Sequence, residues 1–163
     1  MSKIVVVGSI SMDLVMRTKR IPEGGETIFG DSFNIVPGGK GANQAVAIGR
    51  LSSVEDNIYI FGNVGEDIFS ADLLSNLQNN DISTAYVGTV PQSTGVAQIT
   101  LYGGDNRIIY YPGANNLVKT NDWKNEWKLL SDASIVVLQN EIPHETNLSI
   151  AKFCQENKIK VLY

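Results

Sequence analysis

The sequence predicts an α/β fold with a mainly parallel β-sheet, and three observations support this class. Two short apolar runs, residues 4–7 and Ile135–Leu138, show no polar alternation, which is typical of strands buried on both faces of a parallel sheet. Segments with helical apolar spacing lie between the predicted strands, as the crossover connections of parallel strands require. Polar and glycine-rich clusters directly follow the strands, where open parallel sheets bind ligands.

The first part of the chain alternates strands, a turn and a helix. After the strand at 4–7, a short strand is predicted at 14–18. A turn follows at 21–27, where proline and glycine supply the backbone angles. A half-exposed strand is predicted at 28–36. The apolar stripe that runs from Ala42 to Leu51 then predicts a helix.

The middle of the chain changes character. A strand at 57–61 and a loop at 62–67 precede a helix with apolar residues at helical spacing, from Phe69 to Leu77. Alternating apolar and polar residues then predict short strands at 84–90, 93–102 and 107–111, with a hairpin turn at 103–106. We expect these strands to form a sheet with one solvated face, separate from the parallel core.

The last part of the chain returns to the core through residues 112–116. Asn121 or Asp122 can cap a helix that carries Trp123 and Trp127, which we interpret as core residues and not as a base-stacking platform. The strand Ile135–Leu138, a helix at 146–156 and a strand from residue 160 follow. Because the chain stops inside this last strand, we expect it to be the first part of a larger α/β domain with limited stability alone.

Composition excludes several classes of function. The 163 residues are 43% hydrophobic and 18% charged, which is ordinary for one soluble globular domain, and the net charge of -4 argues against a nucleic-acid-binding patch. No apolar run reaches transmembrane length, and no cleavage site follows the N-terminus, so we expect a cytoplasmic protein without a membrane partner. The single cysteine, Cys154, and single histidine, His144, exclude an internal disulfide and a His/Cys metal cluster.

A glycine-rich stretch at 37–44 precedes the first helix. Its glycines let backbone approach a ligand closely, and the new helix presents free N–H groups there. Lys40 adds a point charge, and Asn43 adds an amide that both donates and accepts hydrogen bonds. The spacing fits neither a P-loop nor a dinucleotide fingerprint. On local grounds, a loop that only starts a buried helix remains the alternative.

Two carboxylates lie beyond the carboxyl ends of predicted strands. Asp13 comes shortly after the strand at 4–7, and Glu141 follows Ile135–Leu138. This edge of a parallel sheet is where ligands bind, so both are candidate binding residues. A turn or capping role for Asp13 is the alternative.

Six motifs in sequence order resemble the ribokinase-like carbohydrate kinase family, over the chain from Val5 to Tyr163. They are Gly8-Ser9-Ile10-Ser11-Met12-Asp13, Pro22-Glu23-Gly24-Gly25-Glu26-Thr27, Gly38-Gly39-Lys40-Gly41-Ala42-Asn43-Gln44-Ala45, Gly62-Asn63-Val64-Gly65-Glu66-Asp67, Ser93-Thr94-Gly95-Val96-Ala97 and Gly113-Ala114-Asn115. Each motif alone is weak, but their common order favours the glycine-rich stretch as a ligand site.

The resemblance implies a doubly wound α/β fold, mainly parallel, here truncated to its N-terminal portion over residues 1–163. It also implies a small β-sheet lid over the sugar, with lid strands at about 12–36 and 84–111. In the family the lids of two subunits pair, so the resemblance implies a homodimer through the lid, which would also protect the edges of a small sheet.

The resemblance also implies the sugar contacts. Asp13 would accept hydrogen bonds from two sugar hydroxyls, and Glu141 would be a further sugar contact. The remaining contacts implied by the family are Ser11, Gly39, Lys40, Gly41, Asn43, Ala97, Ile99 and Tyr110. Ser11 is a departure, since the family usually has asparagine two residues before this aspartate, and the departure leaves the sugar open.

The family's catalytic aspartate belongs to a Gly-Ala-Gly-Asp motif, which these 163 residues lack. The implied reaction is ATP-dependent phosphorylation of the 5-hydroxyl of D-ribose. ATP, Mg²⁺ and a monovalent cation such as K⁺ would bind mainly through a second half, so no catalytic or metal residue is expected in this chain. Alternatives are fructose, deoxyribose, a nucleoside or a sugar phosphate as substrate, or a non-catalytic sugar-binding or interaction module.

Overall fold

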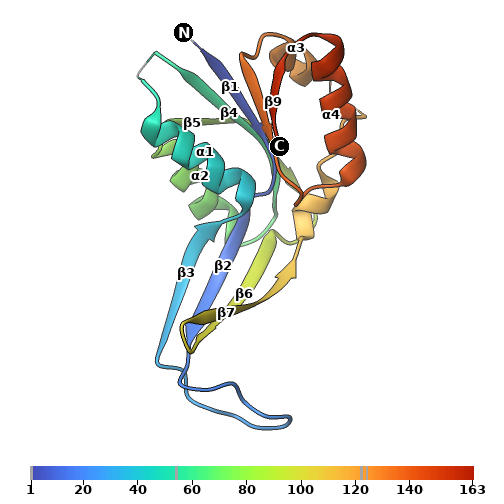
Figure 1. Cartoon of the computed structure of the whole chain (residues 1–163). Helices are drawn as coiled ribbons and strands as arrows, with labels where there is room; N and C mark the ends of the chain where they lie inside the picture. The colour runs from blue at the N-terminus through green and yellow to red at the C-terminus, as the bar shows by residue number, and fades with distance from the viewer. Residues whose placement is uncertain (1, 54, 122, 124) are drawn as a thin grey trace.

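The computed structural model describes residues 2–163 except 54, 122 and 124. Its larger sheet has five strands, all parallel, in the order β5-β4-β1-β8-β9 (Figure 1). The strands are β1 (Lys3–Val7), β4 (Asn57–Gly65), β5 (Ile82–Val90), β8 (Ile135–Leu138) and β9 (Lys160–Leu162). The order reverses on either side of β1, so the crevice between β1 and β8 is the topological switch point of the sheet.

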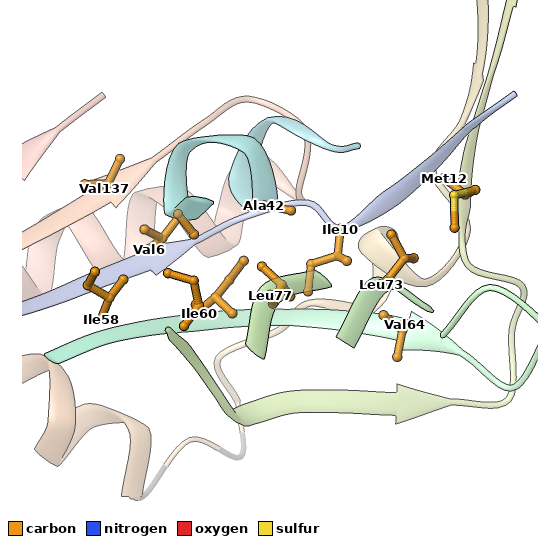
Figure 2. Close-up of a cluster of buried hydrophobic side chains, with 12 residues drawn as sticks. Val6, Ile10, Met12, Ala42, Ile58, Ile60, Val64, Leu73, Leu77 and Val137 are labelled. Atoms are coloured by element: carbon orange, nitrogen blue, oxygen red, sulfur yellow. The ribbon is translucent and has the colours of Figure 1, made fainter. Parts of the chain in front are cut away.

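Helices cover both faces of this sheet, which confirms the doubly wound α/β class. The helices α1 (Lys40–Leu51) and α2 (Ser70–Gln78) lie on one face, and α3 (Asn125–Ser131) and α4 (His144–Glu156) lie on the other (Figure 1). The central strand β1 is apolar throughout its buried part because side chains on both of its faces meet helices. Figure 2 shows the cluster beneath α1 and α2, in which Val6, Ile60 and Leu77 pack together.

A second, four-stranded sheet extends away from the first (Figure 1). Its order is β3-β2-β6-β7, formed by β2 (Ser11–Arg17), β3 (Ser32–Gly38), β6 (Gly95–Tyr102) and β7 (Asp105–Tyr111). The pairs β2–β3 and β6–β7 are antiparallel, and β2–β6 is parallel. A short 3-10 helix, η1 (Gly113–Leu117), returns the chain to the larger sheet.

The turn between β6 and β7 is tighter than predicted. Tyr102 pairs with Asp105, so the turn contains two residues, Gly103 and Gly104. Both have positive φ, 61° and 82°, which is the conformation that two-residue hairpins favour and that glycine adopts without steric cost.

One expected boundary of the small sheet is wrong. The strand predicted at 84–90 is β5, and it pairs in parallel with β4 at the edge of the larger sheet. Most residues of this edge strand are only partly buried, so its sequence resembles that of a strand with one solvated face.

Other boundaries also differ from the predictions. The strand β4 continues to Gly65, through residues expected to form a loop, because Gly62 to Gly65 pair with β5. The strand β2 begins at Ser11, before the predicted start at residue 14, and β3 begins at Ser32 instead of residue 28. The helix α3 begins at Asn125, after the predicted cap at Asn121, and Asp122 lies outside the described residues.

The two tryptophans, predicted as core residues, are partly buried and pack against the core cluster beside α3 and α4. Their rings lie 5.9 Å apart, and Trp123 contacts Phe61 while Trp127 contacts Phe153 of α4. Over the described residues, no helix is long and apolar enough to cross a membrane.

Candidate functional site

A pocket of about 290 Å³ lies between the small sheet and the beginning of α1. Its lining residues are Ser11, Asp13, Gly39, Lys40, Asn43, Ala97, Ile99, Ile108, Tyr110 and Glu141. The structure thus brings together all the site residues named from the sequence except Gly41. The volume is near the lower end of small-molecule sites, about 300–1,000 Å³, and suits a small ligand.

Strand register explains how the small sheet contributes to this pocket. Asp13 pairs with Ala97, and Ala97 pairs with Tyr110, so the three side chains share one face of the sheet. Ile99 and Ile108 form the next pair on the same face. Ile108 was missed from the sequence, although its position two residues before Tyr110 in a strand could have identified it.

The beginning of α1 forms the opposite wall. Gly39 adopts a φ of +88°, and a Cβ there would lie 2.8 Å from both the Ser11 nitrogen and the Ser9 carbonyl oxygen. Only glycine fits this approach without strain. Gly41 packs differently, because a Cβ would lie 2.7 Å from the backbone of Gly8 and Ser9. Gly41 therefore brings the helix close to the end of β1 and does not face the pocket.

Glu141 is the most connected polar group of the pocket. Its carboxylate accepts hydrogen bonds from the Ser9 hydroxyl at 2.7 Å and from the Lys40 backbone N–H at 3.0 Å, and it forms an ion pair with the Lys40 ammonium. Burial by itself would raise the pKa of Glu141, but these hydrogen bonds and the positive charge of Lys40 lower it below its ordinary value. Glu141 is therefore held ionised.

Asp13 has the opposite electrostatic environment. Burial and the nearby negative charge of Glu141 raise the pKa of Asp13, and no hydrogen bond from a described residue offsets them. Gly38 on the neighbouring strand leaves room for the carboxylate, since a Cβ there would lie 2.5 Å from it. The Asp13 oxygens are thus acceptors without a donor among the described residues, in a pocket that a ligand can enter.

Ser11 and Tyr110 belong to a polar network at the base of the small sheet. Their hydroxyl oxygens lie 3.3 Å apart, and the buried amide of Asn115 donates to Ser11 Oγ at 3.0 Å and to Tyr110 Oη at 3.1 Å. Asn115 was missed as a site residue, although the motif Gly113-Ala114-Asn115 already marked its position. Burial is the main cause that raises the pKa of Tyr110, so its hydroxyl stays protonated.

The pocket combines hydrogen-bond acceptors, donors and an apolar wall. Asp13 accepts, Lys40 and Asn43 can donate, and the side chains of the small sheet cover them. This arrangement suits a small ligand with many hydroxyl groups. Among the residues that the structure describes, no group of three or more His, Cys, Asp and Glu side chains could hold a metal ion.

Comparison with known proteins gives a family and several close relatives. The family model for pfkB family carbohydrate kinase matches residues 1–163. The ribokinase of Lactococcus lactis is 58% identical over 163 residues, which cover 100% of this chain and 54% of that protein. The deoxyribokinase of Salmonella typhi is 37% identical over 161 residues, 98% of this chain and 52% of that protein.

A solved structure has the same architecture. The structure of Arabidopsis thaliana ribokinase complexed with ribose and ATP has a TM-score of 0.88 and 32% sequence identity, and the match covers 99% of this chain and 53% of that one. The chain spans about half the length of the curated relatives that it matches.

Proposed function

The chain belongs to the pfkB family of carbohydrate kinases, and from this membership we propose that the whole protein phosphorylates the 5-hydroxyl of D-ribose with ATP. The observation that carries the proposal is the single pocket in which Asp13, Lys40 and Glu141 meet the face of the small sheet. The 58% identity to a ribokinase over the full chain supports ribose as the sugar.

In this proposal the chain holds and orients the sugar. The ionised Asp13 accepts hydrogen bonds from two sugar hydroxyls, because no described residue donates a hydrogen bond to it. Gly39, Lys40, Asn43 and Glu141 contact further hydroxyls. From the small sheet, Ser11 adds a hydroxyl, and Ala97, Ile99 and Tyr110 cover the sugar and exclude water, which strengthens these polar contacts.

The phosphoryl donor and its ions require residues other than those described. The chain lacks the Gly-Ala-Gly-Asp motif, and the described residues contain no candidate metal cluster. ATP would supply the phosphoryl group, with Mg²⁺ and a monovalent cation such as K⁺ as further cofactors. Because the chain spans about half the length of its curated relatives, we assign these groups mainly to a second part of the whole protein. The whole protein would act in the cytoplasm, where ATP is available.

Two observations favour a second sugar. Ser11 stands where the family usually has asparagine, and a deoxyribokinase is among the relatives at 37% identity. A shorter side chain at this position changes the hydrogen bonds offered to the sugar. Deoxyribose is therefore the alternative substrate.

The test is ADP release by the whole protein with ATP and a panel of sugars: D-ribose, 2-deoxyribose, fructose and a nucleoside. We expect the highest kcat/KM with D-ribose. A higher value with 2-deoxyribose would replace the substrate, and no sugar-dependent release would overturn the kinase activity. The isolated 163-residue chain should not phosphorylate a sugar. ADP release from it that needs both ATP and ribose would contradict our assignment of the ATP site to a second part of the protein.

We also propose that two copies associate through their small sheets. Exposed apolar side chains lie on both faces of this sheet, including Phe33, Ile35, Ile108 and Ile109. Association through one face would cover the exposed apolar side chains of that face, and it would protect the strand edges of a small sheet.

A further inference from the structure

Asn115 is a fully buried amide at the base of the small sheet, to which the proposed function gives no role. Its side chain is 0% exposed and lies in η1, directly after β7. The Asn115 Oδ1 atom accepts from the Ile10 N–H at 2.9 Å, and Nδ2 donates to the Ile10 carbonyl at 3.1 Å. The side chain therefore pairs with the backbone of Ile10 as a neighbouring strand would, between the end of β1 and the beginning of β2.

This pairing fixes which way the amide faces. A backbone N–H can only donate, so the atom opposite Ile10 N must be the oxygen, and the amide nitrogen must be the atom that faces Ser11 and Tyr110. One of the two N–H groups of Asn115 points to the Ile10 carbonyl, so both hydroxyl oxygens share the second N–H as acceptors. Their own protons are not used by this amide.

The two hydroxyls then have one proton to offer to the pocket. They lie 3.3 Å apart, so one can donate to the other, while the proton of the second remains available. Both residues line the pocket together with Asp13. The pocket thus contains an acceptor, Asp13, and a donor, the Ser11–Tyr110 pair. A single ligand hydroxyl can donate a hydrogen bond to the first and accept one from the second.

The backbone around this hydrogen-bond network is closely packed against it. A Cβ on Gly95 would lie 2.6 Å from Ser11 Oγ, and it would also overlap the Asn115 amide nitrogen. Any larger residue at position 95 would displace the hydroxyl or the amide. The network is therefore a packed part of the site and not an accident of two nearby hydroxyls.

We propose that Asn115 is a positioning residue that makes the Ser11–Tyr110 hydroxyl pair a hydrogen-bond donor toward the sugar. The inference rests on the proposed function, because it concerns how the same pocket reads a sugar hydroxyl. The proposal means that the oxygen of one sugar hydroxyl accepts a hydrogen bond from this pair. Asn115 acts only through the two side chains and does not touch the sugar.

The test is Asn115→Asp in the whole protein, with D-ribose binding measured by calorimetry. Aspartate keeps the size and the acceptor for Ile10 N–H, but it replaces the amide donor with a second acceptor, toward the Ile10 carbonyl as well as toward the two hydroxyls. Both hydroxyls can then donate inward, and the pocket loses its donor. We expect D-ribose affinity to fall about fivefold, the equivalent of one ordinary hydrogen bond. Protection of the Ile10 amide from hydrogen exchange should persist, which shows that the fold is intact.

The matched background is the double variant Ser11→Ala/Tyr110→Phe, in which Asn115→Asp should have no further effect. An effect of the new charge on the sugar or on Asp13 would occur in both backgrounds and cancel from the comparison. If Asn115→Asp lowered ribose affinity equally in the two backgrounds, the inference about Asn115 would be wrong but the proposed function would stand. Absence of binding of any sugar by the wild-type protein would overturn the proposed function as well.

A variant with milder structural consequences covers the case in which Asn115→Asp does not fold. Ser11→Ala/Tyr110→Phe keeps both hydrogen bonds between Asn115 and Ile10, so the junction between the sheets is retained. It should weaken D-ribose binding by at least about fivefold. Unchanged ribose affinity in this variant would also overturn the inference.

Discussion

At the scale of single residues, the pocket contains two carboxylates with opposite environments. Glu141 receives hydrogen bonds from Ser9 and Lys40, which lower its pKa. Asp13 receives none from the residues that the structure describes, and its pKa is raised. A carboxylate whose ionisation is unfavourable in the folded protein gains most from a ligand that donates hydrogen bonds. Asp13 is therefore the residue at which ligand binding and protein stability oppose each other.

The substitution Asp13→Asn tests this opposition. It keeps the shape but removes the charged acceptor, so we expect sugar affinity to fall about 10- to 100-fold, as for a lost hydrogen bond to a charged group. Because the folded pKa is raised, ionisation of Asp13 costs stability at neutral pH, and the variant should unfold at an equal or higher temperature. Calorimetric titration and thermal unfolding measure the two effects, with exposed Asp31→Asn as the control.

The raised pKa of Asp13 also predicts how sugar binding depends on pH. Only the ionised carboxylate accepts from two hydroxyls, so affinity should decline as pH falls through the folded pKa of Asp13, at a pH above the ordinary value of 3.8. Ionisation of Asp13 lowers the free energy of unfolding. This loss is absent below the pKa of Asp13 in the unfolded chain and complete above its pKa in the folded protein. Affinity that stays constant down to pH 3.8 would contradict a binding role for Asp13.

Gly39 tests the wall of the pocket formed by the helix start. Its φ of +88° and the 2.8 Å approach to two backbone atoms predict that Gly39→Ala destabilises the fold by about 1–2 kcal/mol or more. Gly24→Ala is the matched control, because nothing lies within 4 Å of a Cβ there, and its effect should stay within about 0.5 kcal/mol. Urea unfolding compares them, and equal midpoints would show that the wall tolerates a side chain.

At the scale of elements, Asp67 connects the two sheets. Its carboxylate accepts from the Thr94 N–H at 2.6 Å, the Thr94 hydroxyl at 2.8 Å and the Phe69 N–H at 3.0 Å. Thr94 lies immediately before β6 of the small sheet, and Phe69 immediately before α2 of the larger one. One side chain therefore fixes the beginning of a helix and the beginning of a strand.

We expect Asp67→Ala to destabilise the protein by about 2–3 kcal/mol, because it leaves several donors without an acceptor. Asp72→Ala, an exposed acidic residue in the first turn of α2, is the control and should cost at most about 0.5 kcal/mol. Burial alone would raise the pKa of Asp67, but these hydrogen bonds lower it below its ordinary value. Its contribution is therefore complete above the ordinary value of 3.8 and is lost as pH falls through the folded pKa. Matching unfolding curves for the two variants would refute this role.

Prediction from sequence was most successful where one element carries a strong periodic or continuous pattern. The runs that became β1 and β8, and the helical stripes of α1, α2 and α4, lie within a few residues of their predicted bounds. The strand β5 was assigned to the wrong sheet, because alternation reports how many faces are covered but not which strand lies alongside. Such pairing depends on contacts distant in sequence, which a local pattern does not contain.

The site was predictable for a related reason. Asp13 and Glu141 each follow a buried strand, and the carboxyl ends of parallel strands meet at one edge, so the fold class alone places them together. Ile108 and Asn115 were missed, since their place in the site depends on strand register and on the return of the chain at η1. A motif marked the position of Asn115, but not the atoms that it contacts.

At the scale of the whole molecule, the exposed faces of the small sheet predict association. Ile108 and Ile109 are neighbours in β7 that point to opposite faces, and they are 52% and 72% exposed. If two copies pack sheet against sheet through one face, a charge on that face opposes dimerisation, because an unpaired charge would be buried. The same charge on the other face stays in solvent and has little effect.

We therefore expect one of the variants Ile108→Asp and Ile109→Asp to shift the protein from dimer to monomer, and the other to leave the dimer intact. Sedimentation velocity over a range of concentrations gives the dissociation constant of each, with wild type as reference. The disrupting face should weaken the dimer at least about tenfold, given the cost of burying an unpaired charge. A monomeric wild type, or a dimer that both variants leave unchanged, would refute association through the small sheet.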